Sequence, residues 1–316
     1  MKHFLKENDF SDDEILEVFD RASHLKQNRK QRSGLANDLS GQTWGLLFYK
    51  NSTRTRVSFE VGINELGGNA LVLDQQSTQI GRGESIHDTA KVLSRYLDGL
   101  VIRTFGHEII EEFAAHANIP VVNALTDLLH PCQIYADCFS IAEKLGESRD
   151  PFASLTGRKL AFLGDTSCNM ANSWIMAGKL FGLKVSLAGP QDFAPKPDLL
   201  DLLNKEGMGC DFQFTSDPKE AVTDADVVYT DVWVSMGAEE EEDSRIENMK
   251  PFAVTAEILS QAKPEALFMH CMPTHPGQEV SQEVLDSPQA IIFDQAENRL
   301  HVQKAILAKL AGDSVT

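Results

Sequence analysis

Apolar, strand-like runs alternate with amphipathic helical segments along most of the chain, and this rhythm restricts the possible folds more than any other feature. One series of such segments runs from residue 43 to 146, and a second begins at residue 159. Strands that alternate with helices of about 10–15 residues form βαβ units with parallel strands. The pattern therefore predicts an α/β protein with two doubly wound parallel-sheet domains.

The periodicity also predicts the individual elements. The predicted strands are 43–50, 69–74, 99–104, 119–124, 159–164, 184–189, 224–231, 266–273 and 290–295. The predicted helices are 56–67, 85–97, 107–117, 130–146, 172–182 and 299–312, with an earlier helix opened by the capping-box pair Ser11 and Glu14. A polar segment that contains Pro151 and Gly157 separates the two series and is the expected domain boundary.

The overall charge excludes some classes of partner. The 316 residues include 29 Lys and Arg against 47 Asp and Glu, a formal net charge of −18. Nonspecific nucleic-acid binding depends on basic contacts to phosphate, and an anionic membrane surface also attracts basic segments. We therefore expect neither nucleic acid nor membrane as a partner. An anionic small molecule stays possible, because a local basic cluster can oppose the net charge.

The five cysteines are scattered and form no CxxC pair, a pattern typical of reduced thiols in a cytoplasmic protein. The first residues contain no apolar core typical of a secretory signal. No apolar run approaches the ~18 residues needed to span a bilayer. These features together predict a cytoplasmic protein.

The segment Ser52-Thr53-Arg54-Thr55-Arg56 joins a predicted strand to a predicted helix. A helix N-terminus offers free N–H groups, and hydroxyl and guanidinium groups add donors suited to phosphate. The alternative is an ordinary helix cap with surface arginines. The chain has neither a Walker sequence nor a GxGxxG, which weakens a nucleotide kinase or a nicotinamide dehydrogenase as the function.

Three further motifs lie at strand ends: His130-Pro131-Cys132-Gln133, the run from Asp231 to Gly237, and His270-Cys271-Met272-Pro273. Each motif also has a purely structural interpretation. His130 could cap a helix, the run from Asp231 to Gly237 could be an ordinary loop after a strand, and Cys271 could be a buried small residue. The Cys/His spacing does not favour zinc.

Together these four motifs resemble the aspartate/ornithine carbamoyltransferase family, over a span from about His3 to Leu310. The STRTR and HPCQ segments are similar to its carbamoyl-phosphate half, and the DVWVSMG and HCMP segments are similar to its ornithine branch. The resemblance implies a carbamoyl-phosphate-binding domain of residues 1–147 with a C-terminal helix 299–316, and an ornithine-binding domain of residues 148–298. It also implies a homotrimer whose active sites lie in clefts between domains and subunits, with no cofactor and no metal.

The resemblance further implies the site residues. Those for carbamoyl phosphate are Ser52, Thr53, Arg54, Thr55, Gln79, Arg103, His130, Pro131, Cys132, Gln133, Cys271, Met272 and Arg299, with Gln79 supplied by a neighbouring subunit. Those for ornithine are Asn169, Asp231, Ser235 and Met236. The expected catalytic residues are Arg103, His130, Asp231 and Cys271.

The implied reaction moves the carbamoyl group of carbamoyl phosphate to the side-chain amine of L-ornithine, which yields L-citrulline and phosphate in arginine metabolism. An acylated ornithine or putrescine is the alternative acceptor. A non-enzymatic interaction protein is disfavoured, because the residues expected to carry the chemistry are all present. The acidic run Glu239–Asp243 is interpreted as a solvated surface.

Overall fold

The computed structural model describes residues 1–31, 36–50, 52–74, 83–208, 212–234 and 242–313. The chain divides into two compact units. Unit 1 comprises Met1–Pro151 and Glu297–Thr316, and unit 2 comprises Phe152–Ala296. Among the described residues, no helix combines the length and the apolar character that crossing a membrane requires.

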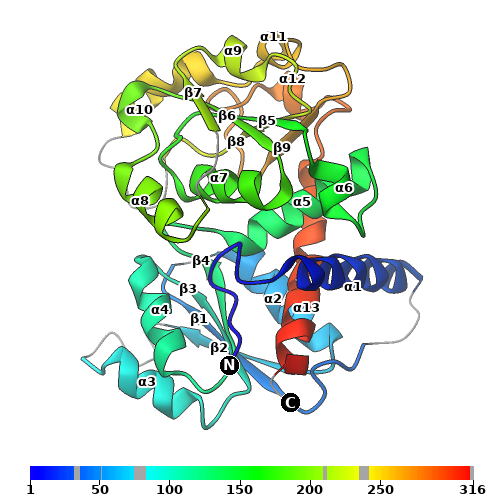
Figure 1. Ribbon diagram of the computed structural model, residues 1–316, viewed down its shortest axis with the longest axis vertical. Coiled ribbons are helices and arrows are strands. Elements are labelled where there is room, and N and C mark those ends of the chain that lie inside the picture. The colour runs from blue at the N-terminus through cyan, green and yellow to red at the C-terminus, as the bar shows by residue number, and fades with distance from the viewer. Residues whose placement is uncertain (32–35, 51, 75–82, 209–211, 235–241, 314–316) are drawn as a thin grey trace. The chain divides into compact units, whose positions relative to one another are not determined.

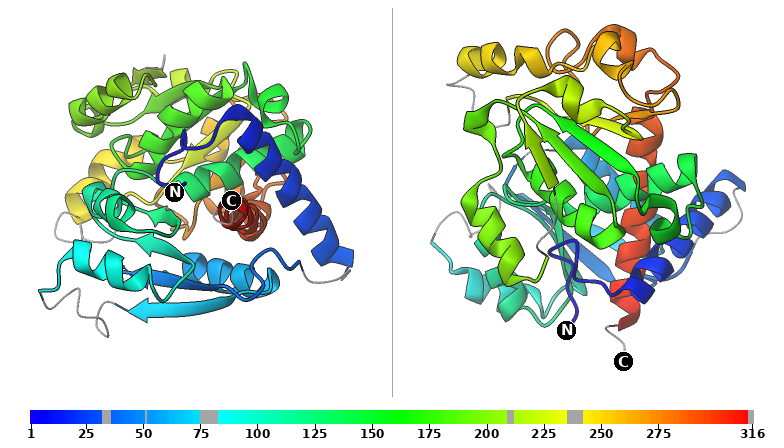
Figure 2. Two further views of the ribbon diagram at one scale, coloured as in Figure 1. Left: turned by 60° about the horizontal axis from the view of Figure 1, so that its bottom comes forward. Right: turned by 45° about the horizontal axis from the view of Figure 1, so that its top comes forward.

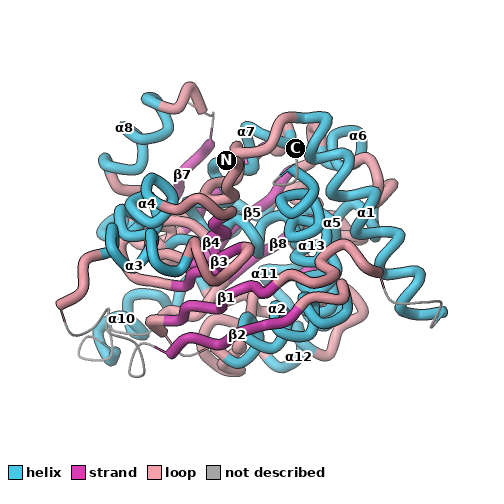
Figure 3. Tube along the Cα trace, turned by 90° about the horizontal axis from the view of Figure 1, so that it is seen from below, coloured by secondary structure: helices cyan, strands magenta, loops and turns pink. Residues whose placement is uncertain are grey.

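Unit 1 is built around a four-stranded parallel sheet with the strand order β2-β1-β3-β4 (Figures 1 and 3). Its strands are β1 (Thr43–Phe48), β2 (Asn69–Asp74), β3 (Gly99–Arg103) and β4 (Val121–Leu125). Its helices are α1 (Asp12–Gln31), α2 (Thr53–Glu65), α3 (Ile86–Leu93), α4 (His107–His116), α5 (Pro131–Leu145) and the larger part of α13 (Ile292–Asp313).

Helices cover both faces of this sheet. The strand order changes direction after β2, and right-handed crossovers therefore place α2 on one face and α3 and α4 on the other. Buried side chains of α3, α4 and the strands form one cluster, which includes Leu47, Leu100, Ile102, Ile110 and Phe113. Because side chains alternate along a strand, Arg103 points away from the face to which Ile102 contributes. The register against β4 also shifts between Ile102 and Arg103.

Unit 2 contains a five-stranded parallel sheet with the order β7-β6-β5-β8-β9. Its strands are β5 (Lys159–Leu163), β6 (Lys184–Ala188), β7 (Phe212–Thr215), β8 (Val227–Thr230) and β9 (Leu267–His270). Its helices are α6 (Pro151–Leu155, which begins at the last residue of the first segment of unit 1), α7 (Asn169–Phe181), η3 (Gln191–Phe193), α8 (Pro197–Lys205), α9 (Pro218–Val222), α10 (Glu242–Met249), η5 (Lys250–Phe252), α11 (Ala256–Leu259) and α12 (Gln282–Leu285).

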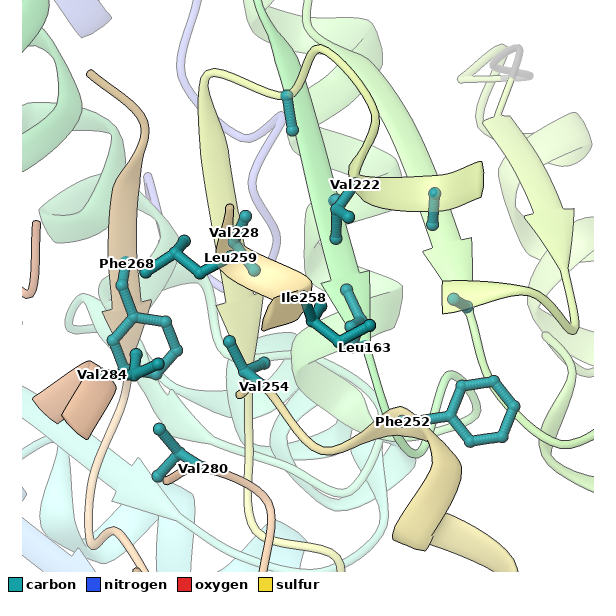
Figure 4. Packing of buried hydrophobic residues seen from close by; sticks show 14 of the residues in the cluster. Leu163, Val222, Val228, Phe252, Val254, Ile258, Leu259, Phe268, Val280 and Val284 are labelled. Carbon is teal, nitrogen blue, oxygen red and sulfur yellow. The ribbon is translucent and has the colours of Figure 1, made fainter. Parts of the chain in front are cut away.

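The second sheet is also covered on both faces. Figure 4 shows the cluster on one face, where Leu163, Val228 and Phe268 of the strands pack with side chains of α9, α11 and α12. On the other face, Trp174 of α7 meets the edge of Tyr229 at a centroid distance of 5.4 Å. The sequence-based prediction of two doubly wound parallel sheets is thus confirmed.

Not every predicted element is present. The predicted strand 290–295 is wrong, because Ala290 makes only an isolated bridge to Phe268 and α13 begins at Ile292. The Gln295 side chain, within that helix, accepts a hydrogen bond from the backbone N–H of His270 (3.0 Å) and donates one to Tyr229 (3.1 Å). Side-chain bonds therefore connect this segment to the sheet in place of strand pairing. The capping box is present: the Ser11 N–H donates to the Glu14 carboxylate over 2.9 Å.

A buried polar network joins three helices of unit 1, and α1 (blue) lies beside α13 (red) in Figure 2. The Lys26 ammonium donates to the Glu143 carboxylate (2.7 Å) and to the Asn298 side-chain oxygen (2.8 Å). The Asn298 amide in turn donates to Ser140 (2.9 Å) and Glu143 (3.1 Å). Burial alone raises the pKa of Glu143, but the hydrogen bonds from Lys26 and Asn298 outweigh it and lower that pKa. The network fixes α13 at the residue before Arg299.

Replacing Lys26 by Met should lower the free energy of unfolding by about 1–3 kcal/mol, because it leaves the buried Asn298 oxygen without its donor. Urea denaturation followed by circular dichroism measures this. The control is Lys219→Met, which removes an exposed ion pair with Glu257 (side chains 55% and 72% exposed) and should cost under about 0.5 kcal/mol. Equal midpoints for the two variants would contradict a stabilising role for the network.

Candidate active site

Functional side chains of unit 1 gather at the carboxyl edge of its sheet. Ser52 follows β1, Arg103 ends β3, and His130 follows β4. The neighbouring strands β1 and β3 form the point at which the strand order changes direction. Ligands of doubly wound sheets bind beyond the carboxyl ends of the strands at such a switch point. The topology alone therefore selects this edge as a binding site.

The N-terminus of α2 has features that favour binding of an anion. The Ser52 hydroxyl caps the helix by accepting a hydrogen bond from the Thr55 N–H (3.4 Å). The first turn of α2 contains no acidic residue, and neither does the first turn of α5, whereas α1, α3 and α4 each have at least one. The positive end of the helix dipole at α2 is thus not compensated by an acid within that turn.

The hydroxyl of Thr55 connects two arginines that are far apart in the sequence. The Arg299 guanidinium donates to the Thr55 Oγ1 over 2.7 Å, and the Arg103 guanidinium donates to the same oxygen over 3.4 Å. All three side chains are buried. A hydroxyl has two acceptor positions and one donor. With both acceptor positions used by arginines, the Thr55 proton is left to donate to a ligand oxygen.

His130 lies beside the two arginines in an uncharged form. It occupies the N-cap position of α5, but its side chain makes no capping hydrogen bond, so the capping interpretation does not hold. Burial, followed by the positive charges of Arg299 and Arg103, lowers its pKa well below the ordinary value. The imidazole is therefore neutral at neutral pH and can donate one N–H to an uncharged carbonyl oxygen. We call Thr55, Arg103, His130 and Arg299 the arginine cluster.

The rest of the HPCQ motif builds the start of α5. Pro131 is the first residue of the helix, and the Cys132 thiol donates to the backbone oxygen of Asn123 over 3.3 Å. Burial raises the pKa of Cys132, which keeps it a thiol. The Gln133 side chain is buried and donates to Asp137 over 2.8 Å. By contrast, Thr53 and Arg54 are exposed on the first turn of α2.

Unit 2 has its own group of side chains at the carboxyl edge of its sheet. Asn169 opens α7 after β5, Asp231 follows β8, and Cys271 follows β9. These three strands are neighbours in the sheet, and the strand order changes direction between β5 and β8. The switch-point rule therefore selects this edge in unit 2 as well.

A thiol and a carboxylate are paired at this edge. The Cys271 thiol donates to the Asp231 Oδ1 over 2.9 Å, and the backbone N–H of Val232 donates to the same oxygen over 2.8 Å. Burial raises the pKa of Asp231, although the charge of His270 and these two hydrogen bonds oppose the shift. A carboxylate with a raised pKa is a better proton acceptor than an exposed one.

Two further residues, His270 and Glu279, lie behind this pair. The His270 Nδ1 accepts from the backbone N–H of Met272 (2.8 Å), so a neutral ring carries its proton on Nε2. Nε2 lies 3.4 Å from the carboxylate of Glu279, and both side chains are fully buried. No sequence motif predicted a role for either residue. His270 was visible within the HCMP motif, but Glu279 follows in an irregular segment that carries no local signal.

Asp231, His270 and Cys271 also offer one donor atom each within 4.8 Å of one another, which is a possible metal-ligand set among the described residues. One carboxylate, one imidazole and one thiolate are ligands that zinc accepts. The hydrogen bond from Cys271 to Asp231 gives each of these two side chains a partner, so their arrangement does not require a metal ion. We call Asp231, His270, Cys271 and Glu279 the thiol–carboxylate cluster.

The predicted residues thus fall into two groups, one in each unit. The group in unit 1 consists of Thr55, Arg103, His130 and Arg299. The group in unit 2 consists of Asp231 and Cys271, and beside it the backbone N–H of Met272 donates to the ring of His270. Three predicted residues, Gln79, Ser235 and Met236, lie outside the described residues, as does most of the acidic run Glu239–Asp243.

Comparison with known proteins gives a similar division, except that the second match extends through the helix that contains Arg299. Residues 2–143 match the carbamoyl-P binding domain of aspartate/ornithine carbamoyltransferase, and residues 156–310 match its Asp/Orn binding domain. The chain is 46% identical to an ornithine carbamoyltransferase of Methanoculleus marisnigri, over 98% of this chain and 96% of the relative. It is 50% identical to one of Syntrophus aciditrophicus, over 92% and 93%.

Solved structures give the same result. The ornithine carbamoyltransferase of Pyrococcus furiosus matches with a TM-score of 0.89 and 42% identity, covering 98% of this chain and 97% of that one. The anabolic enzyme of Campylobacter jejuni matches with a TM-score of 0.87 and 38% identity, covering 99% and 100%. The geometry of both sites, the two domain matches and these relatives lead to one conclusion: the chain belongs to the aspartate/ornithine carbamoyltransferase family.

Proposed function

We propose that this chain transfers the carbamoyl group of carbamoyl phosphate to the side-chain amine of L-ornithine, giving L-citrulline and phosphate in arginine metabolism. The observation that carries the proposal is the pair of arginines on Thr55. Thr55 and Arg103 lie within the segment that matches a carbamoyl-P binding domain, and Arg299 joins them from the C-terminal segment of unit 1. The names of the similar proteins support ornithine as the acceptor. We further propose that unit 1 binds carbamoyl phosphate and that unit 2 binds ornithine.

In unit 1, each part of carbamoyl phosphate has a chemical counterpart. The phosphate suits the N–H groups and hydroxyls at Ser52, Thr53 and Thr55, the start of α2, with Arg54 and Arg299 as cations. The carbonyl oxygen suits donors from Thr55, Arg103 and neutral His130. Negative charge develops on that oxygen during attack, and each donor aimed at it commonly contributes ~2.7–4 kcal/mol. Gln133 suits the carbamoyl nitrogen, and Pro131 and Cys132 shape the same turn.

The acceptor amine has to lose protons before and during the reaction. Its lone pair attacks the carbamoyl carbon, a C–N bond forms, and the C–O bond to phosphate breaks. A side-chain amine titrates near about 10.4, so it is mainly protonated at neutral pH. Asp231, with its raised pKa, would accept the proton of the amine, and the adjacent Cys271 thiol, which donates to Asp231, would help to orient the two groups. Cys271 and Met272 would also contact the carbamoyl group, while Asn169, Ser235 and Met236 would hold the rest of ornithine.

We also propose a cytoplasmic homotrimer whose active sites lie in clefts between subunits, with Gln79 contributed by a neighbour. Among the described residues, Cys132, Cys138, Cys168 and Cys271 form no disulfide, which agrees with a reducing compartment. The edge strand β2 exposes Leu71, and α2 beside it exposes Val57 (46% and 52%), so this part of unit 1 offers apolar surface to another subunit.

The Thr55 hydroxyl should be essential and its methyl group should not. Thr55→Val keeps the shape of the side chain but removes the oxygen on which both arginines converge. We expect kcat/KM for carbamoyl phosphate to fall about 10²–10³-fold, since one donor in an oxyanion site has this effect. Thr55→Ser retains the hydroxyl and should stay within about tenfold of the unchanged protein. Steady-state citrulline formation measures both, and equal losses in the two variants would refute the assignment.

Ornithine should be the preferred acceptor. Citrulline or carbamoyl-product formation is measured with ornithine, N-acetylornithine, N-succinylornithine, putrescine and aspartate at fixed carbamoyl phosphate. Activity with aspartate but not ornithine would overturn the proposal. For the accepted amine, kcat/KM should rise with pH as Asp231 and the amine lose protons. Asp231→Asn should reduce kcat/KM at least about 10²-fold, as expected for loss of a proton acceptor, without changing the affinity for carbamoyl phosphate.

Gln79 should act on a neighbouring subunit. Gln79→Ala and His130→Ala variants are each expected to be nearly inactive, because each lacks one part of every site. Mixed trimers, made by refolding the two variants together, should regain activity, since some sites then combine an intact His130 with an intact Gln79 of the neighbour. A mixture as inactive as its two parents, despite verified subunit exchange, would show that Gln79 serves its own subunit.

A further inference from the structure

Gln133 is held by a buried carboxylate one turn further along α5. The Gln133 Nε2 donates to the Asp137 Oδ1 over 2.8 Å. The two side chains are 1% and 0% exposed. A carboxylate is a costly group to bury, and helices do not require one at this position. Its contact with a residue that we place on the carbamoyl group therefore calls for a functional explanation.

The chemistry of the pair determines which way the carboxamide faces. The two ends of a glutamine amide are nearly equal in size, so shape alone does not distinguish its orientations. In the structure the NH₂ end of Gln133 faces Asp137, whose carboxyl oxygen accepts its hydrogen bond. The other end, Oε1, is then directed away from Asp137. Among the described residues this buried oxygen has no hydrogen-bond partner.

A fixed acceptor is what a carbamoyl group needs at its nitrogen. The carbamoyl NH₂ has two N–H donors, and an amide oxygen accepts from one of them. If the carboxamide of Gln133 turned over, its NH₂ would oppose the NH₂ of the ligand, and two buried donors would face each other. Such a mismatch loses the bond and leaves both donors unpaired. Arg299 has only donors, and neutral His130 is assigned to the carbonyl oxygen through its N–H, so the acceptor for the carbamoyl nitrogen in this set is Gln133.

We propose that Asp137 is a positioning residue that holds the Gln133 carboxamide with its oxygen toward the carbamoyl NH₂, and that this selects carbamoyl phosphate over acetyl phosphate. The two molecules share the phosphate and the carbonyl, and a methyl group in acetyl phosphate replaces the NH₂. The proposal rests on the function proposed above, because it assumes that carbamoyl phosphate occupies unit 1.

The test compares the affinities of the two acyl phosphates. The KM for carbamoyl phosphate and the inhibition constant of acetyl phosphate, competing with it, are measured for the unchanged protein, Asp137→Asn and Asp137→Leu. An asparagine can present either an oxygen or an NH₂ to Gln133, and a leucine presents neither. We expect carbamoyl phosphate to bind about tenfold more weakly in Asp137→Asn, as for one lost hydrogen bond, and more weakly still in Asp137→Leu. Acetyl phosphate should change less than about twofold.

Two further variants separate positioning from packing. Gln133→Leu should lose the same discrimination, and adding Asp137→Asn to it should cause no further loss. Cys138→Ala, at a neighbouring buried position of α5, disturbs the helix without touching Gln133 and should leave the ratio of the two affinities unchanged. Because Asp137→Leu removes a buried polar group, folding is checked by urea denaturation, and Asp137→Asn decides the result if the leucine variant does not fold.

The outcomes are distinct. Equal weakening of both acyl phosphates in Asp137→Asn, or no change in either, would overturn the positioning role. If the unchanged protein forms citrulline and only these variants fail to alter the selectivity, the inference about Asp137 is wrong and the proposed function stands. If the unchanged protein neither binds carbamoyl phosphate nor forms citrulline, the proposed function itself fails.

Discussion

The arrangement of the arginine cluster in unit 1 depends on one atom, the hydroxyl oxygen of Thr55. Two guanidinium groups of like charge repel each other, and the repulsion is strongest where water is excluded. The Thr55 oxygen offers both of them an acceptor, and it does so at the N-terminus of α2, which is itself a positive dipole end. The convergence places concentrated positive charge inside a chain whose net charge is −18. A doubly charged phosphate is the ligand that such a site stabilises best.

The two clusters, one in each unit, follow one topological rule but use opposite chemistry. In each unit the functional residues follow strands at the switch point of a parallel sheet. In unit 1 the edge bears arginines and a neutral imidazole that donate hydrogen bonds. In unit 2 the edge bears Asp231, whose pKa burial raises, and a thiol that donates to it. Under the proposed function, the first edge would receive an electrophile with developing negative charge, and the second would receive an amine that must give up a proton.

The sequence allowed prediction of most of the strands and helices, because buried parallel strands are continuous apolar runs and their helices have a regular period. It failed for 290–295, where apolar residues precede a helix and Gln295 makes tertiary hydrogen bonds that no local pattern signals. The motifs predicted residues that are paired in the structure, such as Asp231 and Cys271. They did not show that Thr55 accepts from both arginines, since these contacts join segments far apart in the chain. They also did not show that Glu279 lies behind His270, because Glu279 lies in an irregular segment that carries no local signal.

The position of Arg299 has a consequence for how the protein is made. Arg299 lies 244 residues after Thr55, in the part of α13 that follows unit 2 along the chain. Domains generally fold as they emerge during synthesis, from the N-terminus onward. Here the first sheet is complete once β4 has been made, but its arginine cluster has to wait for α13. If Arg299 binds phosphate as proposed, a ribosome-bound chain that ends before this helix has the scaffold of unit 1 without its full affinity for phosphate. The last contribution to that affinity is then made after unit 2 has been synthesised.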